Sequence, residues 1–145
     1  MSYTYKYPRP AVTADIILFT NETIPRILLI KRKHDPYKDK WAFPGGFMDE
    51  NETLENAAQR ELKEETNLNN ANLKQFKTYS DPKRDPRGRT ITTVFWSIIN
   101  KEQLQKTRAG DDAVEAKWFA IDNLPPLAFD HNIIISEFKS FLNYS

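Results

Sequence analysis

The sequence predicts an α/β/α sandwich, a fold of the α/β class in which a mixed β-sheet lies between helices. Segments with the composition of strands occur along the chain together with two segments of helical periodicity, the pattern of a sheet covered by helices. The chain has 145 residues, enough for one domain with a hydrophobic core. No repeat, linker or low-complexity segment divides it, so we expect a single domain over residues 1–145.

Five strands are expected because short runs of apolar and β-branched residues are bounded by turn residues. They span residues 12–19, 27–32, 76–80, 90–99 and 116–120. A turn at residues 21–25 joins the first two strands, and a loop with three arginines, residues 81–89, joins the third and fourth.

Two helices are expected. The first spans residues 54–66, with Thr53 as its N-cap and Asn67 as the left-handed residue that ends it. The second spans residues 131–142 and begins after Asp130, a candidate N-cap. Its apolar stripe consists of Ile134, Ile135, Phe138, Phe141 and Leu142.

The first helix carries an unusual set of carboxylates. At about 100° per residue, Glu61, Glu64 and Glu65 share the half of the helix that holds its apolar residues Leu54, Ala57, Ala58 and Leu62. Like charges that leave water repel each other, and a hard cation such as Mg²⁺ or Mn²⁺ would relieve both costs. The alternative is a solvated acidic stripe in which Arg60 pairs with Glu64. On their own helix, Glu61 and Glu65 have no obvious partner at a spacing of three or four.

The spacing of these residues from a glycine pair has a known counterpart. From Gly46 to Leu68 the chain resembles the Nudix box, the signature of the Nudix hydrolases. The matching positions are Gly46, Glu52, Arg60, Glu61, Leu62, Glu64, Glu65 and Leu68. One position departs from the pattern, because Asn67 stands where the family usually has glycine. Asn tolerates the left-handed conformation, so the departure concerns local stability.

The resemblance implies a Nudix-type fold and a role for each matching residue. Glu61 and Glu65 would be the main metal ligands, with Glu64 nearby or acting through water, and the carbonyl of Gly45 would complete the metal shell. Glu64 and Glu65 are also catalytic candidates. Arg60 and Glu52 would form a structural ion pair that holds the loop of Gly46 against the helix.

Further segments resemble the ADP-ribose pyrophosphatase branch of the family and the ADP-ribose-sensing domain of related regulators. They are residues 7–15, 81–89, 109–113 and 127–131. The implied reaction is metal-assisted attack of water on the pyrophosphate of ADP-ribose, with Mg²⁺ or alternatively Mn²⁺, giving AMP and ribose 5-phosphate. The alternatives are a nucleoside triphosphate or sanitising pyrophosphohydrolase and a sensor that binds ADP-ribose without cleaving it. Because the chain ends at Ser145, we expect no appended DNA-binding winged helix.

Substrate-binding candidates lie outside the box. The guanidinium groups of Arg84, Arg87 and Arg89 could bind phosphate oxygens, or could instead pair with Asp81 or Asp85 in a solvated loop. Phe43 is a candidate for stacking on adenine, as are Phe19, Trp41 and Phe129, although each could be a core residue. Glu115 is the first candidate for the general base and Asp112 the second. For His131 we expect a structural role.

Composition limits the remaining possibilities. The net charge is +1, which gives no broad attraction to nucleic acid. The chain has no cysteine, which excludes disulfides and thiolate metal sites and fits a cytoplasmic protein. The first six residues lack an apolar signal core, and no apolar run approaches the length of a membrane span. We therefore expect a small nucleotide as the partner and, from the resemblance, a homodimer.

Overall fold

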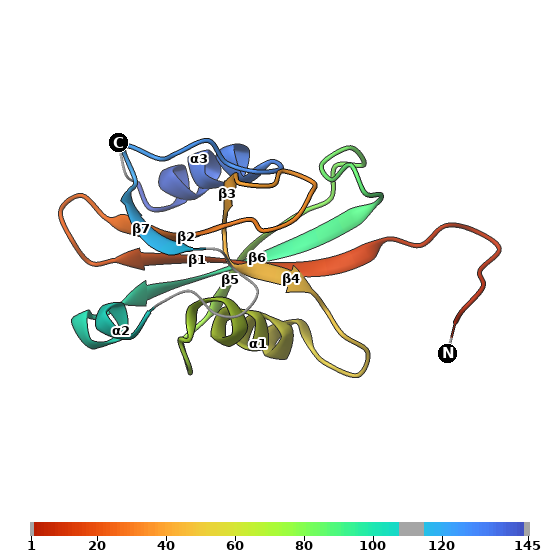
Figure 1. Cartoon of the computed structure of the whole chain (residues 1–145), viewed down its shortest axis with the longest axis horizontal. Coiled ribbons are helices and arrows are strands. Elements are labelled where there is room, and N and C mark those ends of the chain that lie inside the picture. Colours follow the sequence, from red (N-terminus) through yellow and green to blue (C-terminus); the bar gives the residue numbers. More distant parts are fainter. Residues whose placement is uncertain (1, 108–114, 144–145) are drawn as a thin grey trace.

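A mixed β-sheet forms the centre of the computed structural model, which describes residues 2–107 and 115–143 (Figure 1). Within these residues the sheet has seven strands, and its main path runs β3-β2-β1-β6-β5, with β4 paired to β1 and β7 paired to β2. The strands are β1 (Ala11–Thr20), β2 (Arg26–Lys31), β3 (Trp41–Ala42), β4 (Gly45–Phe47), β5 (Lys74–Tyr79), β6 (Thr90–Ile99) and β7 (Ala116–Ala120).

The two longest strands lie side by side at the middle of the sheet. β1 and β6 pair in parallel over their whole lengths, from Ala11 opposite Thr90 to Thr20 opposite Ile99. The other pairings between the named strands are antiparallel, which makes the sheet mixed. β1 is buried on both faces, as expected for a strand covered by helices on each side.

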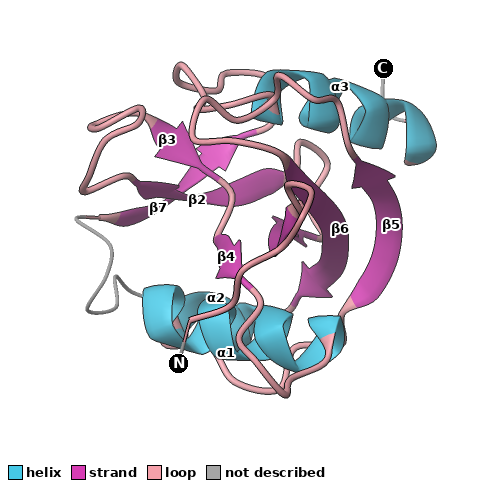
Figure 2. Ribbon diagram, turned by 90° about the vertical axis from the view of Figure 1, so that its right-hand side faces the viewer, coloured by secondary structure: helices cyan, strands magenta, loops and turns pink. Residues whose placement is uncertain are grey.

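Helices cover both faces of the sheet (Figure 2). On one face, α1 (Leu54–Thr66) and α2 (Lys101–Lys106) contribute Leu62 and Leu104 to a core with the even-numbered β1 residues 14, 16 and 18. On the other face, α3 (His131–Phe141) contributes Ile134 and Phe138 to a core with the odd-numbered residues 17 and 19. The period-2 alternation of β1 thus supplies both cores.

The ends of α1 are those that the sequence predicts. The Thr53 hydroxyl accepts a hydrogen bond from the backbone N–H of Asn56 at 3.1 Å. Asn67 has φ of 63°, in the left-handed region, and its N–H donates to the carbonyl of Lys63. The Asn in place of the usual glycine therefore adopts the conformation that ends the helix.

The five predicted strands and both predicted helices are present, each with ends within two residues of the prediction. The sequence prediction missed β3, β4 and α2. β3 and β4 are only two and three residues long. β4 also begins with two glycines, a residue type that is rare in strands. α2 carries a capping box formed by Asn100 and Gln103, a signal that was available in the sequence.

One expectation about α3 was wrong, and a second was confirmed for the position of the residue only. Phe141 was placed in the apolar stripe, but it is 52% exposed, and its ring lies at the edge of the core against Phe76, Trp96 and Phe138. Asp130 stands at the N-cap position, yet its side chain makes no capping hydrogen bond. Its carboxylate instead binds an arginine, as described below.

Near its middle, β1 changes its antiparallel partner. Phe19 pairs with Ile27 of β2, whereas Thr13 and Asp15 pair with Phe47 and Gly45 of β4. β2 and β4 therefore diverge along the same edge of β1, and side chains at the ends of both strands face the space between them. In the part of the chain that the structure describes, no helix has the length and apolar character needed to cross a membrane.

Candidate active site

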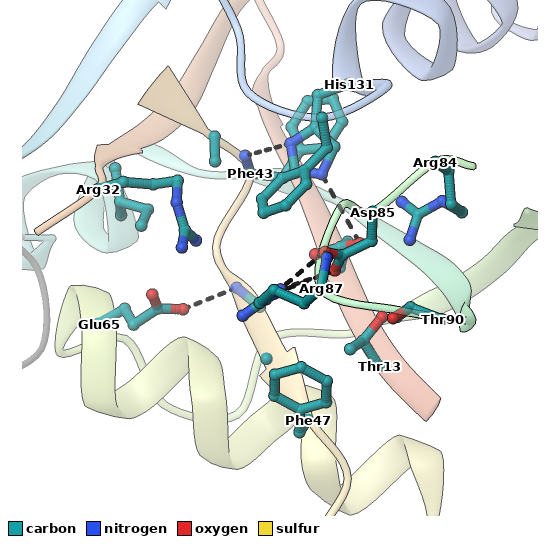
Figure 3. A pocket seen from close by; sticks show the side chains of 16 residues that line it. Thr13, Arg32, Phe43, Phe47, Glu65, Arg84, Asp85, Arg87, Thr90 and His131 are labelled. Atoms are coloured by element: carbon teal, nitrogen blue, oxygen red, sulfur yellow. Dashed lines mark hydrogen bonds and ion pairs between the residues drawn. The ribbon is translucent and has the colours of Figure 1, made fainter. Parts of the chain in front are cut away.

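A pocket of about 210 Å³ lies where β2 and β4 diverge. Its walls come from β1, the end of β2, residues 42–47, the last turn of α1, the loop between β5 and β6, and the start of α3. Segments far apart in the sequence thus meet around one space (Figure 3). We call it the central pocket.

The glycine pair of β4 brings the backbone against two carboxylates of α1. The N–H of Gly45 donates to Oε1 of Glu65 at 2.7 Å. A Cβ at Gly46 would lie 2.5 to 2.7 Å from the carboxylate atoms of Glu61, closer than van der Waals contact allows. Glycine at position 46 therefore leaves the space that the Glu61 carboxylate occupies, and Glu65, which is 6% exposed, lines the pocket.

Arg60 holds the loop before α1 against the helix. Its Nε and Nη2 donate to the two oxygens of Glu52 at 3.1 and 2.7 Å. Nη2 also donates to the carbonyl of Phe47 at 3.0 Å. The hydrogen bond with Glu52 is the largest of the interactions that raise the pKa of Arg60. The ion pair expected between these two residues is thus present.

Two expectations about the acidic helix face were wrong. Glu64 does not share the buried half of the helix, because its side chain is 44% exposed, and it accepts a hydrogen bond from Arg60 at 3.3 Å. Glu61 has a partner on its own helix after all, since Nη1 of Arg60 donates to it at 2.9 Å. The helix wheel missed this contact because the long arginine side chain reaches a neighbour one position along the chain.

The carboxylates of α1 fit a hard divalent cation. Glu61 and Glu65 pack on the backbone of consecutive glycines, so both carboxylates and the Gly45 carbonyl belong to one small region. Oxygen ligands of this kind suit Mg²⁺ or Mn²⁺. Among the described residues, no three acidic, histidine or cysteine side chains form a ready-made metal cluster. Mg²⁺ does not require one, because it usually keeps several waters and binds substrate phosphates.

The three arginines of the β5–β6 loop have different surroundings. The side chain of Arg84 is 4% exposed, and its guanidinium binds both carboxylate oxygens of Asp130 at 2.9 and 2.8 Å. Arg87 is 41% exposed and pairs with Asp85, as the alternative interpretation of this loop expected. Both residues line the central pocket, whereas Arg89 is exposed and lies outside its lining.

Some of the predicted aromatic residues line the pocket, and others lie in the core. Phe43 lines the pocket but is 2% exposed, and its ring stacks on His131 with centroids 4.5 Å apart. Phe129 is half-buried and lines the pocket as well. Phe19 and Trp41 lie in or against the core on the α3 face and outside the pocket lining. Phe47, which the sequence analysis did not single out, lines the pocket and is 41% exposed.

Two buried polar residues, Asp15 and His131, line the pocket. Asp15 accepts a hydrogen bond from Thr92 at 2.7 Å, and burial raises the pKa of Asp15 to about 6. Burial lowers the pKa of His131 to about 3, so its ring is neutral at pH 7. Nδ1 of His131 accepts from the N–H of Phe43 at 3.1 Å, which puts the ring proton on Nε2, 3.8 Å from Asp15. His131 therefore has the structural role that we expected.

The two candidates for the general base do not gain support. Glu115 is exposed immediately before β7, lies outside the pocket lining, and makes a backbone contact in which its carbonyl accepts from the N–H of Lys31 at 2.9 Å. Asp112 lies outside the described residues.

Three charged or aromatic residues of the pocket lining escaped the sequence analysis. Asp15 had a usable signal, because a carboxylate inside an apolar strand indicates a buried charge that needs partners. Phe47 follows the glycine pair directly and could have been included with it. Arg32 ends a predicted strand next to several other cationic residues, and nothing in the sequence indicates that its side chain enters the pocket.

Comparison with known proteins agrees with this geometry. A model of the NUDIX domain matches residues 9–138. The chain is 46% identical over 137 residues to an ADP-ribose pyrophosphatase of Methanocaldococcus jannaschii, an alignment that covers 94% of this chain and 78% of that protein. It is 32% identical over 142 residues to the ADPR responsive transcriptional repressor NtrR of Acinetobacter baylyi, covering 94% of this chain and 56% of the repressor, so it spans little more than half the length of that relative.

A solved structure extends the comparison to the fold. The NUDIX domain of Shewanella oneidensis NrtR, complexed with ADP ribose, superposes with a TM-score of 0.86 at 29% identity, over 97% of this chain and 94% of that one. The resemblance inferred from residues 46–68 and the α/β fold expected from it are both confirmed. The family model matches residues 9–138 of this chain, and a curated relative is 46% identical to it. The chain therefore belongs to the NUDIX domain family.

Proposed function

We propose that this protein is a Mg²⁺-dependent Nudix hydrolase that cleaves the pyrophosphate bond of ADP-ribose to give AMP and ribose 5-phosphate. The observation that carries the proposal is the packing of Glu61 and Glu65 against Gly45 and Gly46, at the edge of a pocket that also contains arginines. The M. jannaschii relative supports the choice of ADP-ribose among pyrophosphate substrates.

Each residue of the site has a task in this proposal. Glu61, Glu65 and the Gly45 carbonyl would hold the cation, with Glu64 at its exposed side. When bound, Mg²⁺ neutralises phosphate charge and lowers the pKa of a coordinated water, and Mn²⁺ could replace it. Glu52 and Arg60 keep the Gly46 loop on α1 through their bidentate ion pair.

The substrate would enter the central pocket with its phosphates near the arginines. Arg87 is the better placed of the two loop arginines that line the pocket, because its side chain is 41% exposed, whereas that of Arg84 is 4% exposed and binds both oxygens of Asp130. Arg84 then acts by fixing the loop to the start of α3. Glu115 and, second, Asp112 stay predictions from the sequence as the group that takes up the proton of the attacking water, and Glu64 stays a predicted catalytic residue near the metal. Arg89 and Phe43 stay predictions as substrate contacts.

A second candidate is supported by the S. oneidensis structure. That NUDIX domain belongs to NrtR and is complexed with ADP ribose, and the A. baylyi relative is an ADPR responsive repressor. A protein of this kind could bind ADP-ribose as a signal. The intact acidic residues at positions 61, 64 and 65 favour hydrolysis.

The distinguishing experiment measures products and binding with the same protein. ADP-ribose is incubated with Mg²⁺, with Mn²⁺ and with EDTA, and AMP and ribose 5-phosphate are quantified. Metal-dependent release of both supports the enzyme. Saturable binding of ADP-ribose without products would establish the sensor instead.

We further propose that the protein acts in the cytoplasm as a homodimer. The absence of cysteine fits the cytoplasm, and the family resemblance suggests the homodimer. Light scattering during gel filtration tests the oligomeric state, and a mass of one chain would contradict it.

A further inference from the structure

Arg32 is a pocket cation whose position is fixed by a backbone contact. It directly follows β2, lines the central pocket, and donates from Nε to the carbonyl of Pro36 at 2.7 Å. This bond holds the side chain near its middle and leaves the two terminal nitrogens for other partners. Figure 3 shows the guanidinium directed into the space that Glu65 and Arg87 also face.

Phe129 holds two guanidinium groups beside its ring. The Cζ atom of Arg32 lies 4.9 Å from the ring centroid, and that of Arg87 lies 5.4 Å from it. Both distances are typical of cation–π contacts. Arg87 is also 4.9 Å from the ring of Phe47. Aromatic rings therefore position both arginines, and the surroundings of Phe129 are occupied by guanidinium groups.

The backbone of Phe129 is unusual. Its φ is +53°, in the left-handed region, which is rare for a bulky side chain and costs about 1–2 kcal/mol. Two hydrogen bonds of the preceding residue, Ala128, hold the backbone in this conformation. The Ala128 N–H donates to the Trp41 carbonyl at 2.8 Å, and the His131 N–H donates to the Ala128 carbonyl at 3.1 Å. The ring of Tyr37 packs on Phe129 at 4.9 Å. The strained conformation turns the ring toward the two arginines.

Arg32 lies among charged groups but makes no direct ion pair with the described residues. Burial and, secondly, the charge of Arg87 lower the pKa of Arg32, while the charges of Glu65, Asp85 and Asp15 act in the opposite direction without offsetting them. Arg87 has a carboxylate partner in Asp85 at 2.8 Å. For Arg32, no carboxylate of the described residues lies within ion-pair distance. An anion in the pocket would supply the missing partner.

We propose that Arg32 is a substrate-binding residue that, together with Arg87, contacts the phosphate oxygens of the substrate. This inference rests on the proposed function and adds to it a residue that lies outside the Nudix box. It also gives Phe129 a role as the support for the two arginines rather than as a surface on which adenine stacks. Guanidinium groups suit this task because they bind phosphate with two parallel hydrogen bonds.

The test compares three variants. Arg32→Gln removes the charge but keeps an amide that can donate to Pro36. Arg32→Lys keeps the charge without the planar fork, and Lys33→Gln removes a neighbouring exposed charge that lies outside the pocket lining. For each, KM and kcat are measured with ADP-ribose and Mg²⁺, the dissociation constant of ADP-ribose is measured by calorimetry in EDTA, and thermal unfolding reports the fold.

We expect Arg32→Gln to raise KM and the dissociation constant in EDTA by about tenfold or more, the equivalent of about 1.4 kcal/mol of lost binding. Arg32→Lys should recover part of this loss, and Lys33→Gln should match the wild type. Unchanged binding in Arg32→Gln would overturn the proposal. If Arg32→Gln does not fold, Arg32→Lys decides, because a raised KM supports the bidentate contact and an unchanged KM refutes it.

Failure of this inference can be told apart from failure of the proposed function. If the wild type hydrolyses ADP-ribose and Arg32→Gln binds it equally well, only the assignment of Arg32 is wrong. If the wild type neither binds nor cleaves ADP-ribose, the substrate assignment fails, and inorganic pyrophosphate becomes the calorimetric probe for Arg32. Weaker pyrophosphate binding by Arg32→Gln would then support the assignment, and equal binding would overturn it.

Discussion

The neighbouring glycines of β4 should respond differently to the same substitution. In Gly45→Ala, the new Cβ would lie 2.3 Å from the backbone oxygen of Ala14 and 2.8 Å from Cα of Asp15, both in the paired strand β1. Backbone in the middle of a sheet cannot move away easily. In Gly46→Ala, the three nearest atoms all belong to the carboxylate of Glu61, the end of a flexible side chain.

The expected magnitudes follow from these contacts. Overpacking against β1 should cost Gly45→Ala about 3 kcal/mol, which corresponds to a fall in Tm of about 6–12 °C for a domain of this size. In Gly46→Ala the Glu61 carboxylate must retreat from 2.5 Å to an ordinary contact of at least 3.4 Å. A displacement of about 1 Å at a catalytic group can reduce turnover about 100-fold, while Tm should change little.

Two assays separate these effects. Thermal unfolding in EDTA gives the stability of each variant, and turnover of ADP-ribose across a Mg²⁺ titration gives the effect on the site. The reasoning is refuted if Gly46→Ala has wild-type turnover and wild-type dependence on Mg²⁺, because the position of Glu61 beside the glycine would then be irrelevant. A wild-type Tm for Gly45→Ala would refute the close approach of β4 to β1.

Four further predictions concern other parts of the site. Glu65→Gln keeps an oxygen that can accept from Gly45 and should retain the fold, but it should lose most metal-dependent turnover; near-normal kcat would remove Glu65 from the metal site. Arg87→Ala should raise KM for ADP-ribose, and an unchanged KM would make its contacts purely structural. Asp130→Asn leaves the buried guanidinium of Arg84 without its charge partner and should lower the free energy of unfolding by about 3 kcal/mol, measured by urea denaturation; a loss well under 1 kcal/mol would contradict a buried pair. Because burial lowers the pKa of His131 to about 3, its stabilising contribution is present above its unfolded pKa near 6.5 and is lost as pH falls toward 3. Between pH 7.5 and 5 the wild type should therefore lose about 2 kcal/mol more unfolding free energy than His131→Gln, and equal losses would show that the imidazole can be protonated in the folded protein.

The sequence was informative where a single element carries the signal. The spacing of Glu61 and Glu65 on one helix, and of both from the glycine pair, depends only on helix geometry and a short loop. The capping residues Thr53 and Asn67 likewise act within one turn of α1. These features could be predicted because the interacting groups are close in sequence.

Other features depend on contacts between distant segments and could not be predicted in this way. Arg84 and Asp130 pair across 46 positions, and Arg32 reaches the ring of Phe129 from another part of the chain. The way the β5–β6 loop packs against the start of α3 determines that Arg84 is buried and Arg87 is exposed. Helical periodicity also misplaced Glu64, because a helix wheel does not show where the covering sheet ends.

The chemistry of the pocket follows from both kinds of feature. α1 supplies the carboxylate of Glu65 through local geometry. The residue after β2, the β5–β6 loop and the segment before α3 supply arginines and an aromatic ring through the fold. A divalent cation and a pyrophosphate have complementary requirements, since the former needs carboxylate oxygens and the latter needs cationic donors. The central pocket offers both within one space (Figure 3).

The most direct test of the account is product analysis with a panel of substrates and Mg²⁺. The panel contains ADP-ribose, other nucleoside diphosphate sugars, dinucleoside polyphosphates, NADH and nucleoside triphosphates. We predict equal amounts of AMP and ribose 5-phosphate from ADP-ribose, at a kcat/KM far above that of the other compounds. Preferred hydrolysis of a nucleoside triphosphate, or saturable ADP-ribose binding without any product, would contradict it.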